Sequence, residues 1–341
     1  MNHPQINLES LKEGTAEDVR GFLVQYYKKN NPPPHLKKPL SIFIKNCRYR
    51  KDDFRPLLIK LGYEMNGGKS NQYILPAMAS IHLLLLSFIP IDDVIDGAAK
   101  QNFNSSKEFA EKLALAYSLS IELKENSRAI IREYYGNSKN HPKICKLFSG
   151  CIKQTDGSHF LEVKSHLSKD LQQYSVDDYL YLVDRATSPS IEFPFVLGGL
   201  LAGIDNGEEK TMRDYGIKVG RLAQIRDDFL DYLNPKFTGK IPFSDLSEKR
   251  KRFPLLIAYK RGNKSEKETI KRILEKEKIS QEDICNIMDM ITSKRVEQES
   301  RKIIDQIYRG AIKNLQQLPK TNKAYRVLEQ LANLFAMKAL Q

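Results

Sequence analysis

Three aspartates, Asp92, Asp93 and Asp96, stand at the end of a long apolar run that extends from Ile81 to Ile91. On a helix, residues three and four apart lie on the same face, so the three carboxylates would share one side. Like charges crowded on an apolar helix repel one another unless cations lie between them. Such oxygen-only ligand sets suit Mg²⁺, which keeps some waters and usually bridges to a substrate phosphate. One motif alone is more often a solvated helix end.

The same spacing returns at Asp227, Asp228 and Asp231, preceded by Gln224 and again in an apolar helical context. Asp227 follows Asp96 by 131 residues (227 minus 96), which is far enough for the two motifs to occupy different helices. Two such helices that face one another across a cavity could hold several Mg²⁺ ions around a diphosphate. The pair of identical motifs is therefore a specific signal for a metal-dependent diphosphate site.

The composition describes a large chain with a substantial core and a basic surface. Of 341 residues, 41% are hydrophobic and 28% are charged, and the net charge is +13. A basic balance fits nucleic acid, an anionic membrane or a phosphorylated small molecule as partner. No zinc-finger, RNP-like or basic-zipper pattern accompanies the charge, so we do not expect a nucleic-acid partner.

The cysteines and the apolar runs indicate a compartment. Four scattered cysteines, without C-x-x-C or zinc-ligand spacing, fit reduced thiols in the cytoplasm. Residues 1–13 are polar and lack the apolar core of a secretory signal. The longest apolar run, near residues 83–91, is too short to span a bilayer. We therefore expect a cytoplasmic protein that is not transmembrane.

Helical periodicity dominates the chain from Pro39 onward, and alternating β-branched runs are scarce. Residues 1–35 are expected to be a peripheral segment whose last part contains the helix-breaking prolines 32–34, and we expect a single all-α domain over residues 36–341. Its expected architecture is a bundle of long helices around a central cavity. The expected elements are helices at 55–62, 75–96, 109–135, 144–167, 176 onward with a break at 188–189, 193–204, 214–232 and 325–340, and a charged loop at 234–252.

These features together resemble the trans-prenyltransferase (polyprenyl diphosphate synthase) family of the isoprenoid-synthase superfamily, of which this chain would be an atypical member. The likeness covers roughly residues 52–256. Besides the two acidic motifs, it rests on several short matches in the family's order: Arg55-Pro56, Leu75-Pro76, Thr187, Gly239-Lys240, Asp245-Leu246, Lys251 and Pro254-Leu255-Leu256. The resemblance implies the class I isoprenoid-synthase fold, Mg²⁺ dependence and a homodimer.

Several positions depart from the family's pattern. Asp52 stands where the family has a lysine, with Lys51 beside it, and Leu85 takes the place of a helix histidine. Ala186 replaces the lysine of the family's Lys-Thr pair, although Arg185 adjoins it. These losses fall on the groups that hold isopentenyl diphosphate in the family.

Of the four side chains expected to hold isopentenyl diphosphate, only Arg55 is plainly retained. Charge-assisted contacts from arginine and lysine do most of the recognition of a diphosphate. Either neighbouring cations such as Lys51 and Lys100 substitute, or this co-substrate is not used in the usual way.

The resemblance also implies roles for the retained residues. Asp92, Asp96 and Asp227 would bind roughly three Mg²⁺ ions, or Mn²⁺ in their place. The carboxylates expected to support them, as further ligands or catalytic residues, are those of Asp93, Asp228 and Asp231. Lys240 would neutralise charge on the leaving diphosphate. The residues expected to contact substrate are Arg55, Lys51, Thr187, Gln224, Arg185, Lys251, Phe88 and Leu85.

We also expect roles for the apolar residues before the first motif and for the basic run after the second motif. Leu84, Leu85 and Phe88, with Ser87, are expected to line a dry apolar pocket for the prenyl chain. In the family, bulk at the positions of Ser87 and Phe88 limits product length, but one small and one large residue decide nothing here. The run 249–252 is expected to be a solvated loop, or a loop that closes over a bound diphosphate as in the family.

Three functions remain open. In the first, an allylic prenyl diphosphate ionises and its prenyl group is transferred, with isopentenyl diphosphate as an acceptor. In the second, a class I terpene cyclase, an internal double bond attacks the cation and diphosphate is released. In the third, the chain is a non-catalytic partner subunit of a prenyl synthase, against which the six intact aspartates argue. We place transfer first.

Overall fold

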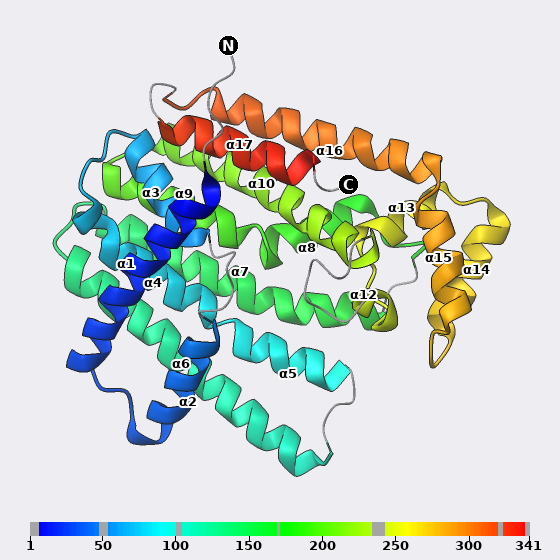
Figure 1. Cartoon of the computed structure of the whole chain (residues 1–341), viewed down its shortest axis with the longest axis horizontal. Helices are drawn as coiled ribbons and strands as arrows, with labels where there is room; N and C mark the ends of the chain where they lie inside the picture. The colour runs from blue at the N-terminus through cyan, green and yellow to red at the C-terminus, as the bar shows by residue number, and fades with distance from the viewer. Residues whose placement is uncertain are drawn as a thin grey trace. The chain divides into compact units, whose positions relative to one another are not determined.

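The computed structural model describes residues 7–47, 54–99, 104–168, 171–233, 243–319 and 323–337. Within these ranges all regular structure is α-helical, as predicted (Figure 1). The helices are α1 (Leu8–Lys29), α2 (Pro34–Cys47), α3 (Arg55–Met65), α4 (Asn71–Leu86), α5 (Ile89–Ala99), α6 (Ser106–Tyr135), α7 (His141–Ser168), α8 (Val176–Ala186), α9 (Pro189–Ala202), α10 (Asn206–Leu233), α12 (Ser244–Ser247), α13 (Phe253–Arg261), α14 (Lys264–Glu275), α15 (Gln281–Ile291), α16 (Lys294–Leu315) and α17 (Lys323–Met337).

The described residues belong to two compact units. The first comprises residues within 1–153, 190–213 and 316–328, and the second comprises residues within 154–189, 214–315 and 329–341. The first acidic motif belongs to the first unit and the second motif to the second unit. That the two motifs face one another across a cavity therefore stays a prediction, as does the division of the chain at residue 35.

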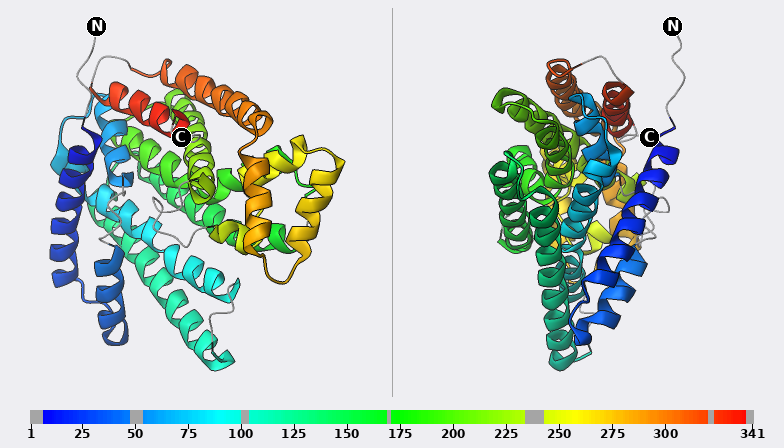
Figure 2. Two further views of the ribbon diagram at one scale, coloured as in Figure 1. Left: turned by 45° about the vertical axis from the view of Figure 1, so that its right-hand side comes forward. Right: turned by 90° about the vertical axis from the view of Figure 1, so that its left-hand side faces the viewer.

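Helices α4 and α6 lie side by side in the first unit (Figures 1 and 2), and α4 also packs against α1 and α3. Two serines join α4 to α6. The hydroxyl of Ser80 donates to the carbonyl of Ser127, and the hydroxyl of Ser127 donates to the carbonyl of Ser80, both at 2.8 Å. Both side chains are fully buried, so these reciprocal bonds satisfy polar groups that would otherwise destabilise the core.

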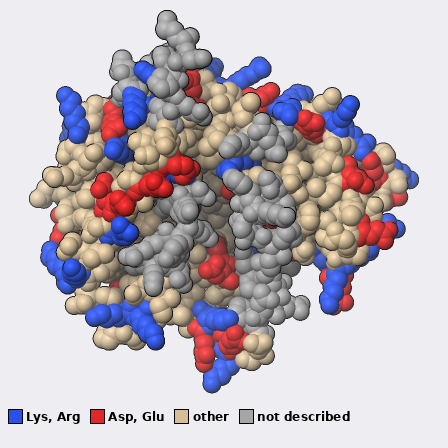
Figure 3. Space-filling model, in the orientation of Figure 1, with Lys and Arg blue, Asp and Glu red and all other residues tan. Residues whose placement is uncertain are grey.

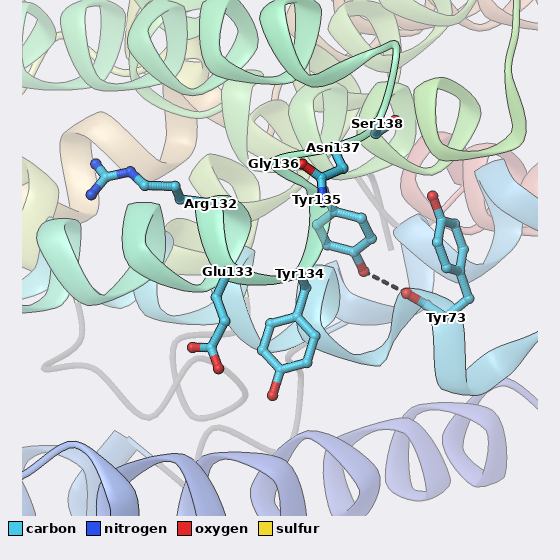
Figure 4. Close-up of a pocket in the computed structure, with 8 residues that line it drawn as sticks. All are labelled: Tyr73, Arg132, Glu133, Tyr134, Tyr135, Gly136, Asn137 and Ser138. Carbon is cyan, nitrogen blue, oxygen red and sulfur yellow. Dashed lines mark hydrogen bonds between the residues drawn. The ribbon is translucent and has the colours of Figure 1, made fainter.

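Tyr135, at the end of α6, inserts its hydroxyl into the backbone ladder of α4 (Figure 4). The hydroxyl donates to the carbonyl of Tyr73 at 2.5 Å and accepts from the amide of Ala77 at 3.2 Å. Pro76 lies within this turn and has no amide proton to donate. The tyrosine hydroxyl thus bridges the Tyr73 carbonyl and the Ala77 amide beside this proline.

A pocket of about 310 Å³ opens beside this bond, and no site residue predicted from the sequence lines it. Its lining comes from the start of α4 and the end of α6: Tyr73, Arg132, Glu133, Tyr134, Tyr135, Gly136, Asn137 and Ser138 (Figure 4).

The single helix predicted over residues 75–96 is wrong, because the structure has two helices there. Helix α4 ends at Leu86 and α5 begins at Ile89. Pro90 cannot donate a backbone hydrogen bond to Leu86, and the hydroxyl of Ser87 donates instead to the carbonyl of Leu84 at 2.5 Å. The turn at Ser87 and Phe88 therefore separates the apolar wall from the acidic motif.

One stretch, Asn71–Ile95, is long and apolar enough to cross a membrane by length and composition, with a mean hydropathy of 2.1. It contains the shorter run at 83–91, which is apolar except for Ser87. However, 78% of its most apolar window is buried inside the structure, as in the core helix of a globular protein. The stretch is therefore weak support for a membrane span.

In the second unit, α13 is almost wholly buried and packs against α8, α14, α15 and α16. Helix α10 approaches the end of α8 closely: a Cβ on Gly220 would lie 2.5 Å from the Cα of Ser188. Arg221 on α10 binds both carboxylate oxygens of Asp184 on α8, at 2.7 and 2.6 Å. These contacts hold α10 against α8 ahead of the second motif. The predicted break at 188–189 is confirmed, since α8 ends at Ala186 and α9 begins at Pro189.

On the face shown in Figure 3, the described basic and acidic side chains are interspersed. Mixed charges of this kind are typical of a solvated surface. The expectation of no nucleic-acid partner stays a prediction.

Candidate active site

The first acidic motif occupies α5. Asp92 and Asp93 are exposed, whereas Val94 is buried on the helix that packs against α6. The amide of Asp92 donates to the carbonyl of Phe88 at 3.1 Å, so the motif begins in the first turn of the helix. Asp96 lies on α5, but its side chain is outside the described residues. The two described carboxylates are thus available to a ligand from solvent.

The predicted apolar wall lies at the end of α4 and in the turn that follows. Leu84, Leu85, Ser87 and Phe88 are all buried. The ammonium of Lys124 on α6 lies 5.0 Å from the centroid of the Phe88 ring, within the range of a cation–π contact. The wall is well packed, and it directly precedes the first motif.

The second acidic motif, on α10, divides between the surface and the interior. The side chain of Asp227 is 61% exposed, whereas Asp228 and Asp231 are each 1% exposed. Asp228 and Asp231 are three residues apart and share a face of the helix, and Asp227 is turned away from them. One carboxylate of this motif therefore faces solvent while two face the interior.

The two inward carboxylates hold the starts of the next two helices. The amide of Phe253, the first residue of α13, donates to Asp228 Oδ2 at 3.0 Å. The amide of Asp245, in α12, donates to Asp231 Oδ2 at 3.2 Å. A carboxylate at a helix N-terminus satisfies an amide that has no partner within the helix. The motif thus organises the chain that follows it.

Asp228 is also linked by hydrogen bonds to two other residues predicted from the sequence, Gln224 and Thr187. The side-chain amide of Gln224 donates through its Nε2 to Asp228 Oδ1 at 2.7 Å, and the hydroxyl of Thr187 donates to Gln224 Oε1. The hydroxyl of Tyr179 donates to Asp228 Oδ2 at 2.8 Å. Burial raises the pKa of Asp228 to about 6, although the cation of Arg252 and the donors Phe253 and Gln224 oppose this shift. Thr187, Gln224 and Asp228 therefore form one hydrogen-bonded chain.

The run 249–252 is not a solvated loop, so that prediction is wrong. Lys251 is 8% exposed, and the side chains of Arg250 and Arg252 are each 14% exposed. Both arginines lie near Glu162 Oε1, at 3.3 Å from Arg250 and 3.0 Å from Arg252. Carboxylates from α7 and α12 draw these arginines inward, because a buried guanidinium requires anionic partners.

Comparison with known proteins identifies the family. The sequence model of the polyprenyl synthetase family matches residues 41–291. The chain belongs to this family. The octaprenyl diphosphate synthase of Escherichia coli (strain K12) is 23% identical over 271 residues, which cover 79% of this chain and 80% of that protein.

Solved structures of polyprenyl synthetases have the same fold. A decaprenyl diphosphate synthase from Rhodobacter capsulatus gives a TM-score of 0.79 at 18% identity, over 97% of this chain and 99% of that one. A geranylgeranyl pyrophosphate synthase from Corynebacterium glutamicum, complexed with isoprenyl diphosphate and magnesium, gives 0.80 at 19% identity, over 98% and 100%. The predicted isoprenoid-synthase fold is confirmed. The products in these names differ in length, so the comparison does not assign a chain length.

The remaining predicted site residues differ in accessibility. Arg55 is half-buried at the first turn of α3, and Arg185 stacks on Tyr181 with its guanidinium 3.4 Å from the ring centroid. The ammonium of Lys251 lies 5.9 Å from the ring of Tyr174. Lys51, Lys100 and Lys240 lie outside the described residues. Their roles stay predictions.

The exposed carboxylates of the two motifs fit Mg²⁺ chemically. Asp92, Asp93 and Asp227 offer hard oxygen donors that are open to solvent, and Mg²⁺ is usually held by one or two carboxylates with several waters. Among the described side chains, no three from histidine, cysteine, aspartate or glutamate lie together as a complete metal cage. Carboxylates of this kind suit a hydrated ion.

Four residues at this site were not among those predicted from the sequence: Glu162, Tyr179, Asp245 and Arg252. Arg252 stood within a basic run, which is more often a solvated surface. Its partner Glu162 lies 90 residues away in the chain, and no sequence pattern links them. Asp245 stood among the short matches that carried the family resemblance, but no role was assigned to it.

Proposed function

We propose that this polyprenyl synthetase is an Mg²⁺-dependent prenyltransferase that ionises an allylic prenyl diphosphate and transfers its prenyl group. The observation that carries the proposal is the repeated acidic motif with a solvent-facing carboxylate in each copy. Asp92 and Asp93 on α5 and Asp227 on α10 supply that feature. The match of the family model over residues 41–291 supports the same chemistry.

Asp92, Asp93, Asp96 and Asp227 bind the metal ions in this proposal, and Asp231 is retained as a further ligand. When bound, Mg²⁺ neutralises the charge that develops on the leaving diphosphate as the carbon–oxygen bond breaks. The bonding electrons leave with the diphosphate, and Lys240 supplies further positive charge to it, while Arg55 binds isopentenyl diphosphate. Mn²⁺ substitutes for Mg²⁺, because both accept the same oxygen donors.

The apolar wall protects the allylic cation. Leu84, Leu85 and Phe88 bring hydrocarbon rather than hydroxyl groups to the prenyl chain, and they are closely packed. A dry wall delays capture of the cation by water until the acceptor's double bond attacks. The new bond then forms between the two isoprenoid units, and loss of a proton leaves a longer allylic diphosphate.

A second candidate function, a terpene cyclase, is favoured by the loss of cationic residues that are expected to hold isopentenyl diphosphate. Ala186 stands at the family's lysine position, and Arg185 beside it stacks on Tyr181 and donates to the carbonyl of that residue at 3.0 Å. The hydroxyl of Thr187 donates to Gln224, so its proton is already engaged. With fewer cations for isopentenyl diphosphate, an internal double bond would be the competing nucleophile.

The test is to incubate purified protein and Mg²⁺ with geranyl, farnesyl or geranylgeranyl diphosphate, each with and without isopentenyl diphosphate. Separation of products into diphosphates and hydrocarbons distinguishes the candidate functions. A longer diphosphate that appears only with isopentenyl diphosphate is expected. A cyclic hydrocarbon or alcohol formed without it would identify a cyclase. No product under any pairing would favour a non-catalytic partner subunit.

We further propose a cytoplasmic homodimer. Leu113, Tyr117 and Ile121 are spaced four residues apart on α6 and are 41%, 63% and 45% exposed, so they form an apolar stripe on one helix face. Such stripes are more often covered than left in water. Light scattering of the purified protein would give twice the mass of one chain, and an Ile121→Asp variant would shift it toward one.

A further inference from the structure

Arg252 connects three segments of the second unit through its guanidinium. Its Nη2 donates to Glu162 Oε1 on α7 at 3.0 Å, and its Nε lies 3.4 Å from Asp245 Oδ1 on α12. Arg252 directly precedes α13, whose first amide is bound to Asp228. Burial opposes the charge on Arg252, but Asp245, Glu162 and Asp228 raise its pKa well above the ordinary value. Arg252 is therefore permanently charged in the folded protein.

The same segments hold the inward side of the second motif. Asp245 donates its amide to Asp231, and Phe253 donates its amide to Asp228. Arg252 is the ion-pair partner of Asp245 and the chain neighbour of Phe253. Displacement of either amide would allow the end of α10, and with it Asp227, to change its orientation.

We propose that Arg252 is a positioning residue that sets the orientation of Asp227 toward its ligand by holding α12 and the start of α13 against the buried carboxylates of α10. This inference rests on the proposed function, because it assigns Asp227 to a metal–diphosphate complex. It adds a residue from the basic run for which the sequence suggested only a solvated loop or a closing loop. Partners that orient metal ligands typically change metal affinity or activity by about 10–100-fold when they are lost.

Two variants separate positioning from charge. Arg252→Lys keeps the charge, but a single ammonium cannot reproduce the planar fork that reaches Glu162 and Asp245 together. Arg252→Met removes the charge, which by Coulomb's law alone would make a nearby cation bind more tightly. Positioning predicts weaker cation binding in both variants, whereas a purely electrostatic role predicts no change in the first and tighter binding in the second.

The experiment titrates Mn²⁺ into the full-length protein with inorganic diphosphate present, and follows bound Mn²⁺ by electron paramagnetic resonance. We expect the dissociation constant for Mn²⁺ to rise about tenfold in Arg252→Lys and at least as much in Arg252→Met. Arg295→Lys, which changes an exposed arginine paired with Glu266, is the matched control and should bind as the wild type does. Amide exchange over residues 225–233 and 243–256 should be faster in both Arg252 variants.

Three results would overturn the proposal. Wild-type affinity in Arg252→Lys with tighter binding in Arg252→Met would show a charge effect only. Wild-type affinity in both variants with a lowered melting temperature would show a role in stability only. Unchanged amide exchange would show that nothing is repositioned. If the Arg252 variants do not fold, Glu162→Gln removes the same anchor and should weaken Mn²⁺ binding in the same direction.

The proposed function and this inference fail differently. Turnover of allylic diphosphates is measured on the wild type alone, and its absence contradicts the function. The amide exchange needs neither turnover nor a bound metal, so it decides whether Arg252 holds the end of α10 in either case.

Discussion

At the residue scale, neighbouring aspartates of the second motif differ in exposure and in hydrogen bonding. Asp227 is exposed and lies 3.5 Å from the guanidinium of Arg226, while Asp228 is buried and accepts hydrogen bonds from Tyr179, Gln224 and Phe253. A carboxylate surrounded by three donors is an anchor for the fold. The family resemblance already separated Asp227, as a metal ligand, from Asp228 and Asp231 in supporting roles. Spacing alone could not show that Asp228 is buried, because it contains no information about which side of a helix is covered.

Asp227→Asn should therefore abolish function without loss of stability. The side chain is exposed, so the free energy of unfolding should change by no more than about 0.5 kcal/mol. Loss of a metal-binding charge should lower turnover of the allylic diphosphate by about 10²–10³-fold. Thermal melts and product assays on the same preparation check both parts. A large fall in melting temperature would contradict the assignment of Asp227 to the surface.

Asp283 gives a residue-scale prediction about pH. The ammonium of Lys276, at 2.6 and 2.8 Å, and the capping contacts with Ser280 lower the pKa of Asp283 to about 2. The folded state thus favours the charged form, and its stabilising effect is complete above the unfolded-state pKa of about 3.9. That effect is lost as the pH falls through about 2.

The measurement compares melting temperatures of the wild type and Asp283→Asn from pH 6 to pH 2. The difference should be full at pH 6 and should shrink between about pH 4 and pH 2. Asp289→Asn, an exposed substitution on the same helix, controls for the loss of one negative charge. A difference that grows as the pH falls would have the wrong sign for a lowered pKa.

At the scale of the elements, the hydroxyl of Tyr135 adds a polar link between α4 and α6 to the one made by Ser80 and Ser127. Tyr135→Phe would leave the carbonyl of Tyr73 and the amide of Ala77 without their partner in the core. We expect a loss of about 1–3 kcal/mol in the free energy of unfolding, since buried polar groups without hydrogen bonds are costly. Chemical denaturation measures it. Tyr134→Phe, at a residue 48% exposed, should have little effect, and equal losses in both variants would contradict the bridge.

The turn between α12 and α13 offers a stabilising change. Lys249 has a φ of 58°, a left-handed conformation that costs a residue with a Cβ about 1–2 kcal/mol. Lys249→Gly should therefore raise the free energy of unfolding by about 1 kcal/mol. Gly203 has a φ of 90°, and a Cβ added to it would have no atom within 4 Å, so backbone strain alone should give Gly203→Ala the opposite sign. A loss of stability in Lys249→Gly would show that its side chain contributes more than its backbone costs.

Helix positions could be predicted from the sequence because periodicity and prolines act over short distances. The predicted helix at 55–62 corresponds to α3 and the one at 109–135 to α6. The break at Ser87 and Phe88 was missed because the apolar pattern continues through it, and only the missing amide of Pro90 marked it. The burial of Arg252 could not be predicted, because it depends on Glu162, 90 residues away.

At the scale of the whole molecule, the acidic motifs belong to different units of the chain. Each unit positions its own motif: α4 and α6 support α5, while α8, α12 and α13 support the end of α10. The proposed chemistry requires that both motifs bind one metal–diphosphate complex. From the sequence, the paired motifs and the family resemblance predicted one shared metal–diphosphate complex. The sequence also predicted Leu84 and Phe88 as residues of the apolar wall.

The most direct test of this central claim is a double-mutant cycle between the motifs. The affinity for Mn²⁺ in the presence of inorganic diphosphate would be measured for Asp93→Asn, Asp227→Asn and the double variant. If the motifs share one complex, the losses should be strongly non-additive, and the double variant should bind little more weakly than either single variant. Losses in free energy that add fully would show two independent sites and would contradict the account.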